Sequence, residues 1–253
     1  MSNLRTPGLL GKWPLIGLML ILVGVCLFGV TAVSVQTHGP LLQSETGIVN
    51  DLHATALQSS PFIRGVMILG YYVGQEIIVA IGAVLVLYFL YRRYWTEFWM
   101  VVIAWGGEGG IWIVLSQDFN RARPVFDIPV WHQMTSPGFP SGHSFGAVLC
   151  YGLLAYLLAP KMTSRVWKAV VIAAALLIIL YVGFSRVFVG DHYPTDVVAG
   201  YGLGIAWGGL VYTTVELVFQ RRAKKREEIG VPHSSFDHRE QGDIHATGTP
   251  NRN

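Results

Sequence analysis

The sequence is poor in charged residues, which make up 13% of its 253 positions, whereas hydrophobic residues make up 52%. An ordinary soluble domain carries about 25% charged residues. The apolar residues are gathered into long runs, and the mean hydropathy is +0.47. This composition excludes an ordinary soluble domain and predicts a protein that crosses a membrane several times.

Cysteines are equally scarce, since the chain has two, Cys26 and Cys150, and both lie in apolar runs. We interpret them as small packing groups, because such a pair supports neither a disulfide framework nor a cysteine metal site. Exposed aromatic residues interleaved with cations, which are typical of nucleic-acid binding, are also missing. The net charge of +3 therefore does not indicate a nucleic-acid partner.

Six apolar runs approach the length of about 20 residues that crosses a bilayer core. They lie at residues 13–35, 66–91, 98–115, 145–159, 166–184 and 197–219. The fourth run is short, and residues 141–144 extend it toward the interface. The first run is longer than the apolar part of a signal peptide, so we expect it to be retained. The predicted fold is an all-α bundle of six transmembrane helices.

The basic residues predict the orientation of this bundle. Twelve flank the run ends on one side: Arg5, Lys12, Arg92, Arg93, Lys161, Arg165, Lys168, Arg221, Arg222, Lys224, Lys225 and Arg226. The other side receives four: Arg64, Arg121, Arg123 and Arg186. By the positive-inside rule, both termini are cytoplasmic, and the loops after the third and fifth helices face outward. We expect a multi-pass protein of the cytoplasmic membrane with its site in these extracytoplasmic loops.

One membrane domain is predicted, over residues 13–220. Residues 1–12 form a cytoplasmic lead, and residues 221–253 form a tail that is first basic and then disordered, since it has few apolar residues and no periodicity. Its basic start is interpreted as a stop-transfer flank that also attracts anionic lipid headgroups. Residues 37–65 are predicted to be an outer loop at the membrane surface.

Three segments of the outer loops carry the residues that phosphoryl transfer needs. They read Arg121-Ala122-Arg123-Pro124, then Pro140-Ser141-Gly142-His143, and then FSRVFVGDHYPTD at residues 184–196. Together they supply three arginines, two histidines and a carboxylate: Arg121, Arg123, Arg186, His143, His192 and Asp196. Each segment alone is a weak signal, but their combination on one membrane face indicates a site for a phosphate group.

His192 and Asp196 have the spacing of a nucleophile and its orienting carboxylate. A nucleophilic histidine needs one free ring nitrogen and an acceptor for the N–H of the other. Pro194 suits a first helical turn, so Asp196, four residues after His192, is expected beside the ring. The remaining acidic and histidine residues of the outer loops are interpreted as loop formers and surface residues: Asp118, Asp191, His53 and His132.

The other motif residues are assigned to the phosphate and the leaving group. His143 opens the fourth helix and can protonate a leaving oxygen. The backbone N–H groups of Ser141 and Gly142, at the same helix N-terminus, form an anion site. Arg123 and Arg186 are expected to hold the nonbridging phosphate oxygens.

Glycines and two carboxylates mark the predicted spans. The glycines are expected where helices pack closely, because small residues let backbones approach; they are Gly106, Gly107, Gly109, Gly110, Gly200, Gly202 and Gly204. Glu76 and Glu108 are carboxylates within the membrane, where ionisable groups often have a function. No regularly spaced partners define a pathway for them, so a protonated or hydrogen-bonded structural role is favoured over transport.

The three motifs resemble those of the type 2 phosphatidic acid phosphatase superfamily, in particular its bacterial integral-membrane phosphatases of phosphatidylglycerophosphate and undecaprenyl pyrophosphate. The similarity covers roughly residues 60–220. It implies a six-helix membrane bundle in which His192 attacks phosphorus to form a phosphohistidine, Asp196 orients His192, and His143 protonates the leaving group. The resemblance also implies that the phosphate is bound without a metal or other cofactor by Arg123, Arg186, Ser141 and Gly142.

One position departs from the pattern of this superfamily. The first motif usually begins with a lysine seven residues before the arginine of its Arg-Pro, and Ser116 stands there in this chain. Either Arg121 supplies the missing charge, or the site accepts a different headgroup. Because alternate side chains of an extended segment point to the same side, Arg121 is expected to bind substrate together with Arg123.

The sequence thus predicts a membrane phosphatase acting on a lipid phosphomonoester or pyrophosphate. An outward-facing site favours a carrier lipid such as undecaprenyl pyrophosphate, while phosphatidylglycerophosphate and phosphatidic acid stay open. Two alternatives are a lipid phosphotransferase and a protein that binds or transports lipid phosphates without hydrolysis. Six spans argue against a vanadium haloperoxidase, which shares the motifs. The expected partners are the lipid phosphate and membrane lipids, with no obligate protein partner.

Overall fold

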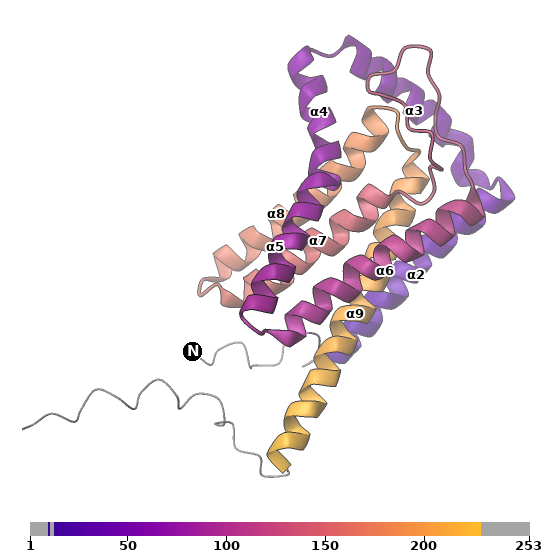
Figure 1. Cartoon of the computed structure of the whole chain (residues 1–253). Helices are drawn as coiled ribbons and strands as arrows, with labels where there is room; N and C mark the ends of the chain where they lie inside the picture. The colour runs from indigo at the N-terminus through magenta and orange to yellow at the C-terminus, as the bar shows by residue number, and fades with distance from the viewer. Residues whose placement is uncertain (1–9, 11–12, 229–253) are drawn as a thin grey trace, which may run out of the picture.

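The computed structural model describes residue 10 and residues 13–228, and every regular element in that part of the chain is a helix. The elements are α2 (Pro14–Thr37), α3 (Pro40–Gln58), α4 (Pro61–Gly74), α5 (Glu76–Tyr91), α6 (Trp95–Phe119), α7 (Gly142–Leu158), the 3-10 helix η1 (Ala159–Lys161), α8 (Arg165–Phe188) and α9 (Pro194–Glu228). Six helical stretches are long and apolar enough to cross a membrane. The predicted all-α bundle of six spans is confirmed (Figure 1).

Helices α2 and α9 pack side by side through glycines. A β-carbon on Gly24 of α2 would lie 2.4 Å from the backbone nitrogen of Ala206. One on Gly202 of α9 would lie 2.7 Å from the backbone nitrogen of Phe28. Both distances are shorter than a van der Waals contact, so only glycine permits this approach. The pair brings the first and last spans together along the bundle (Figure 1).

The close packing predicted for the glycines of α9 is confirmed, whereas that predicted for α6 is mostly wrong. A β-carbon on Gly200 would lie 2.4 Å from the carbonyl oxygen of Ser141, which fixes the start of α7 against α9. On α6, Gly107 faces the ring of Trp207. The other three glycines of α6 have no neighbouring atom within 4 Å in the described part of the chain: Gly106, Gly109 and Gly110.

Helix α3 corrects the prediction of an outer loop at residues 37–65. It begins at Pro40, whose fixed φ suits the first helical turn. Its buried residues recur every three or four positions, as on one face of an amphipathic helix: Glu45, Val49, His53 and Ala56. Two of these four are ionisable, so hydrophobicity alone did not identify the buried face. Helix α3 lies across the end of the bundle that is opposite the C-terminal end of α9 (Figure 1).

The second span begins earlier than predicted and is interrupted. It starts at Pro61, and Gln75 separates α4 from α5 with φ −133° and ψ −76°. Glu76 is the exposed first residue of α5. Glu108 lies deeper, where a β-carbon on Gly146 of α7 would be 3.5 Å from its carboxylate oxygen. The structural role favoured for these two carboxylates stays a prediction.

Helix ends, and not only loops, carry the motif residues. His143 lies in the first turn of α7, Arg186 near the end of α8, and Asp196 in the first turn of α9. His143 and Asp196 were predicted at helix starts, which is confirmed, whereas the prediction of Arg186 in a loop is wrong. A helix end holds a side chain more firmly than a loop does, because its backbone is hydrogen-bonded on the helical side.

Helix α9 continues past the predicted domain boundary at residue 220 and includes the basic cluster, ending at Glu228. The disordered tail predicted beyond it and the cytoplasmic lead, apart from Leu10, lie outside the described residues. The backbone amide of Leu10 donates a hydrogen bond of 3.3 Å to the Tyr156 hydroxyl. Cys26 and Cys150 are free thiols, as predicted.

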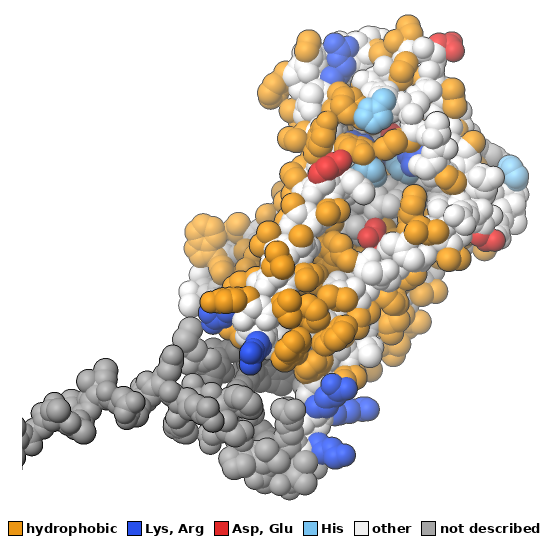
Figure 2. Space-filling model, in the orientation of Figure 1, with side chains coloured by type: hydrophobic (Ala, Val, Ile, Leu, Met, Phe, Trp, Pro, Cys, Tyr) orange, Lys and Arg blue, Asp and Glu red, His pale blue; other side chains and the backbone are white. Residues whose placement is uncertain are grey.

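Most of the described cations gather at one end of the bundle, and the described histidines lie at the other end together with a few cations (Figure 2). The ends of α5 and α9 and the start of α8 carry the basic residues, among them Arg92, Arg93, Arg165, Lys224 and Lys225. The segment between α6 and α7 lies with α3 at the opposite end (Figure 1). The predicted separation of charge is confirmed, while the side of the membrane that each end faces stays a prediction.

Candidate active site

The three motifs, which are far apart in the chain, converge on His192. Arg123 comes from the segment between α6 and α7, His143 from α7, and Arg186 from α8. The backbone N–H of His192 donates to the carbonyl of Arg186 over 3.3 Å, and Ser141 N–H donates to the Asp196 carbonyl over 3.0 Å. The first bond closes the third motif on itself, and the second joins the second motif to the third.

His192 and Asp196 form the predicted pair. His192 Nδ1 lies 3.4 Å from Asp196 Oδ2, and the two side chains are 1% and 0% exposed. Pro194 starts α9, which brings Asp196 back beside the ring. The same Oδ2 accepts a hydrogen bond of 2.9 Å from the backbone N–H of Tyr193. The backbone of the turn between His192 and Asp196 therefore holds the Asp196 carboxylate beside the imidazole.

The neighbours of His192 define its tautomer. Arg123 Nη1 lies 3.0 Å from His192 Nε2. Asp196 Oδ2, which accepts from Tyr193 N–H, faces His192 Nδ1, so Nδ1 carries the ring hydrogen and Nε2 of the neutral ring is unprotonated. This is the tautomer that a nucleophilic Nε2 needs, although Arg123 covers its lone pair.

Burial keeps His192 neutral. Desolvation, followed by the positive charge of Arg123, lowers the pKa of the imidazole from 6.5 to about 3. The carboxylate of Asp191 opposes this shift, and Arg186 adds to it. The free base is therefore the form present throughout the neutral pH range.

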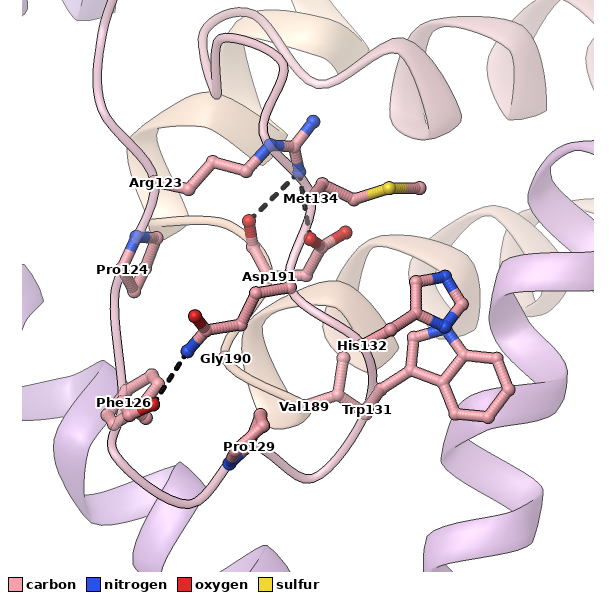
Figure 3. A pocket seen from close by; sticks show the side chains of 11 residues that line it. Arg123, Pro124, Phe126, Pro129, Trp131, His132, Met134, Val189, Gly190 and Asp191 are labelled. Carbon is pink, nitrogen blue, oxygen red and sulfur yellow. Dashed lines mark hydrogen bonds and ion pairs between the residues drawn. The ribbon is translucent and has the colours of Figure 1, made fainter.

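The Arg123 guanidinium is anchored by two segments, one that contains Ser136 and Pro137 and one that contains Asp191. Its Nε donates to the Ser136 carbonyl over 2.8 Å. Its Nη1 donates to Asp191 Oδ1 over 2.9 Å and to the Asp191 carbonyl over 3.0 Å (Figure 3). The Nη2 group binds the Ser136 hydroxyl at 3.2 Å and the Pro137 carbonyl at 3.3 Å. The guanidinium is held in place before any substrate arrives.

Arg186 is a completely buried guanidinium, 0% exposed, at the end of α8. Its Nε donates to the Ser185 hydroxyl over 3.2 Å, and its Nη2 donates to the Met67 carbonyl over 3.4 Å. The Tyr71 ring lies 5.5 Å from the guanidinium carbon. Among the residues described, its buried Nη1 has no hydrogen-bond partner. This nitrogen is available to an anion.

His143 also has a free nitrogen. Its Nε2 is buried and has no hydrogen-bond partner within the described ranges. The ring packs against Tyr71, with centroids 4.9 Å apart. The Ser141 hydroxyl caps α7 by accepting from Ser144 N–H over 3.4 Å. Because Ser141 N–H already binds Asp196, the anion site predicted at this helix start depends on Gly142 N–H and not on both amides.

Asp191 belongs to the site, and its prediction as a loop former was too narrow. Besides its bond to Arg123, its Oδ2 lies 3.9 Å from Arg186 Nη1 and 3.9 Å from His192 Nε2. That oxygen is buried and has no hydrogen-bond partner in the described part of the chain. A carboxylate thus stands between Arg123, Arg186 and the Nε2 atom of His192. Its position directly before His192 was the signal in the sequence.

Gly190 allows this placement of Asp191. Its φ is +77°, a conformation that favours glycine. A β-carbon there would lie 2.5 Å from the ring of Phe126. That ring stacks on His53 of α3, with centroids 3.6 Å apart. The prediction of His53 as a surface residue is wrong, because the ring is buried in this stack.

Arg121 does not lie beside Arg123. Its Nη1 donates to Asp196 Oδ1 over 2.5 Å and to the Thr195 hydroxyl over 2.7 Å, and its Nη2 binds Glu45 of α3. The predicted common direction of the two arginines is not observed. Ser116, at the position of the missing lysine, is buried, and its hydroxyl donates to the Ile113 carbonyl.

Two hollows lie next to Arg123. One, of about 10 Å³, is bordered by Asp191, Phe126 and Trp131 (Figure 3), and its volume is close to the minimum that one water molecule needs. The other, of about 380 Å³, is open and borders the segment between Asn120 and Pro137. His192 itself is almost inaccessible, so the groups around Asp191 must shift before a phosphate reaches it.

Two comparisons with known proteins, one of sequence and one of fold, identify the family of this chain. Residues 109–219 match the model of the PAP2 superfamily. A crystal structure of a transmembrane PAP2 type phosphatidylglycerolphosphate phosphatase from Bacillus subtilis superposes with a TM-score of 0.61 at 30% identity, covering 79% of this chain and 96% of that one.

Two curated relatives are similar over about half of this chain. Phosphatidylglycerophosphatase B of Bacillus subtilis (strain 168) is 38% identical over 131 residues, which are 51% of this chain and 61% of that protein. The undecaprenyl-diphosphatase of Sulfolobus acidocaldarius is 32% identical over 112 residues, 44% of this chain and 47% of that protein. The alignments thus span less than two thirds of either relative. With its six spans, three motifs and the near-complete superposition, this chain belongs to the PAP2 superfamily.

Proposed function

We propose that this protein is a membrane lipid phosphatase that works through a covalent phosphohistidine at His192. The observation that carries this proposal is the set of buried groups without partners around the Nε2 of His192. Within the described residues, Arg186 Nη1 and His143 Nε2 both lack a hydrogen-bond partner. Unpaired buried polar groups are costly, and a phosphate bound at His192 gives both of them an acceptor.

In the proposed reaction, Nε2 of His192 attacks phosphorus as the bond from phosphorus to the lipid oxygen breaks. His143 gives a proton to that oxygen. Asp196 stabilises the positive charge that develops on the His192 ring through the Nδ1 hydrogen. Water then attacks the phosphohistidine and loses a proton to His143, and phosphate leaves. His192 and His143 return to their starting states.

Arg123 and Arg186 are assigned to the nonbridging oxygens of the phosphate. Each charge-assisted hydrogen bond typically contributes about 1.5 to 3 kcal/mol. Arg123 must leave the lone pair of His192 Nε2 for the attack to occur, and a phosphate oxygen that accepts from Nη1 would draw it away. Substrate binding thus uncovers the nucleophile. Gly142 N–H, at the start of α7, is a further donor for the same oxygens.

The substrate class follows from the membrane setting and from the relatives. The name of the Bacillus relative supports phosphatidylglycerophosphate, and that of the Sulfolobus relative supports a polyprenyl pyrophosphate such as undecaprenyl pyrophosphate. Both are lipids with a terminal phosphate. We assign the end with the motifs to the extracytoplasmic face and both termini to the cytoplasm, because the basic residues gather at the opposite end.

Phosphate release by the purified protein tests this proposal. The panel contains phosphatidylglycerophosphate, undecaprenyl pyrophosphate and phosphatidic acid, each with and without a chelator. His192→Ala should abolish release, while His38→Asn, at an exposed histidine of the same end, should leave it unchanged. Transfer of phosphate to an added alcohol instead of water would identify a phosphotransferase. Binding of the lipids without release would identify a protein that only binds or transports them.

A further inference from the structure

Glu45 of α3 is a buried carboxylate, 3% exposed, that contacts the catalytic motifs. Its Oε2 accepts a hydrogen bond of 2.5 Å from the Thr195 hydroxyl, and its Oε1 forms an ion pair with Arg121 Nη2. Glu45 lies 150 residues from Thr195 in the chain. The two contacts join the surface helix α3 to the first turn of α9.

Arg121 bridges two carboxylates. Its Nη2 binds Glu45, and its Nη1 donates to Asp196 Oδ1 over 2.5 Å. The flat guanidinium lies over the Tyr193 ring, 4.4 Å from its centroid. Nη1 uses both of its hydrogens on Thr195 and Asp196, and Nη2 uses one on Glu45, so three of the five N–H donors of this guanidinium bind the protein itself.

The bridge completes the set of groups that hold Asp196. The Oδ2 atom is held by Tyr193 N–H and faces His192 Nδ1, while Oδ1 is held by Arg121. The carboxylate plane cannot turn without losing one of these contacts. Since Asp196 sets the direction of the imidazole, the geometry of the nucleophile depends on Arg121 and, through it, on Glu45.

We propose that Glu45 and Arg121 are positioning residues, in which Glu45 holds the Arg121 guanidinium on Asp196 and thereby orients His192. Arg121 then serves the nucleophile and not the phosphate. This inference rests on the proposed function for its kinetic consequences. Without Glu45, Arg121 would be free to turn toward the open hollow that it borders, and Asp196 would lose a donor.

The kinetic test uses Glu45→Gln, which keeps the shape of the side chain and removes its charge, and Arg121→Gln, which removes the charge and shortens the side chain. We expect kcat to fall about tenfold or more, as for a lost transition-state contact, with KM changed by less than about twofold. Affinity for inorganic phosphate should stay within about twofold of wild type, because Arg123 and Arg186 hold the anion. Asp51→Asn removes an exposed carboxylate from the same helix and is the matched control.

The double variant Glu45→Gln/Arg121→Gln tests whether Glu45 acts through Arg121 or independently of it. If Glu45 acts only through Arg121, Glu45→Gln adds little once Arg121→Gln is present, so the losses are strongly non-additive. Additive losses would contradict the proposal. So would a large loss of phosphate affinity at unchanged kcat in Arg121→Gln, which would make Arg121 a phosphate ligand.

A measurement without turnover separates this inference from the proposed function. In protein labelled with ¹⁵N-histidine, the His192 signals are assigned by their absence in His192→Gln. Wild type should show Nδ1 protonated, and Glu45→Gln should show a mixture of tautomers.

If no lipid phosphate is hydrolysed but this change occurs, the phosphatase proposal fails and the positioning role stands. An unchanged tautomer in a folded Glu45→Gln overturns the inference. Should Glu45→Gln not fold, Glu45→Asp, which keeps the charge on a shorter side chain, takes its place with the same criteria.

Discussion

Asp191 Oδ1 accepts a hydrogen bond of 2.9 Å from Arg123, while Oδ2 of the same carboxylate lies 3.9 Å from Arg186. The two arginines assigned to the phosphate therefore share an anion supplied by the chain itself. A bound phosphate competes with Asp191 for both guanidinium groups. This competition offsets part of the attraction that two buried arginines would otherwise exert on a phosphate.

We expect Asp191→Asn to increase the affinity for inorganic phosphate about tenfold, the equivalent of about 1.4 kcal/mol or one charge-assisted hydrogen bond. The neutral amide keeps the shape of the side chain but no longer competes as an anion. Titration calorimetry on the purified protein measures the change. Asp127→Asn, at an exposed carboxylate of the loop between α6 and α7, is the control. Weaker binding in Asp191→Asn would instead mean that Asp191 orients Arg123 for the substrate.

His192→Ala should abolish both turnover and the formation of a phosphoenzyme, because no other group is placed to form the bond to phosphorus. Asp196→Asn should retain a residual rate, lower by roughly 100-fold or more, since the imidazole loses its anionic partner. Rapid quenching with labelled lipid phosphate measures the acid-labile phosphoenzyme. Acid-labile phosphate on the His192→Ala protein would disprove the assignment of the nucleophile.

Residue spacing was enough to predict the pair of His192 and Asp196, because Pro194 fixes a helix start between them and four residues then return the carboxylate to the ring. The spans were equally predictable, since each depends on a local run of apolar residues. Both predictions used interactions within a few residues along the chain.

The parts of the site that were mispredicted depend on distant contacts. Arg121 was expected beside Arg123 from the alternation of an extended segment. The carboxylates of Glu45 and Asp196, however, attract its guanidinium to the other side, and the carbonyl of Arg121 binds Gly138 N–H over 2.8 Å. Glu45 lies on a helix whose buried face mixes polar with apolar residues, so no local pattern marked it as part of the site.

Protonation of His192 should destabilise the fold at low pH. The pKa of His192 is about 3 in the folded protein against 6.5 for a free imidazole, so the unfolded chain binds more protons below pH 6.5. Stability should therefore be unaffected by this group above that pH and fall below it, by up to about 1.4 kcal/mol per pH unit. Unfolding in detergent between pH 7 and pH 5 should show a smaller pH slope for His192→Asn. An equal reduction of the slope in His38→Asn, at an exposed histidine, would contradict this assignment.

The close contact of α2 with α9 gives a packing prediction with an internal control. Gly24→Leu should destabilise the bundle by about 1 to 3 kcal/mol or more, because a β-carbon there meets the α9 backbone at 2.4 Å. Gly29→Leu, on the same helix, should have little effect, since nothing lies within 4 Å of its β-carbon position among the described residues. Thermal unfolding in detergent compares the two variants. Equal stability would show that α2 and α9 do not pack through Gly24.

The orientation of the bundle decides which lipids reach the site, and single cysteines can measure it. In a Cys26→Ala/Cys150→Ala background, Asp51→Cys on α3 and Lys225→Cys on α9 each supply one exposed thiol at opposite ends. Since the basic end is expected in the cytoplasm, an impermeant maleimide on intact cells should label Asp51→Cys and should label Lys225→Cys only after permeabilisation. This result would give the site access to lipid phosphates of the outer leaflet, such as a carrier lipid to be recycled. The inverse pattern would turn the site toward the cytoplasm, where a phosphatidylglycerophosphate newly made in the inner leaflet would be the better candidate.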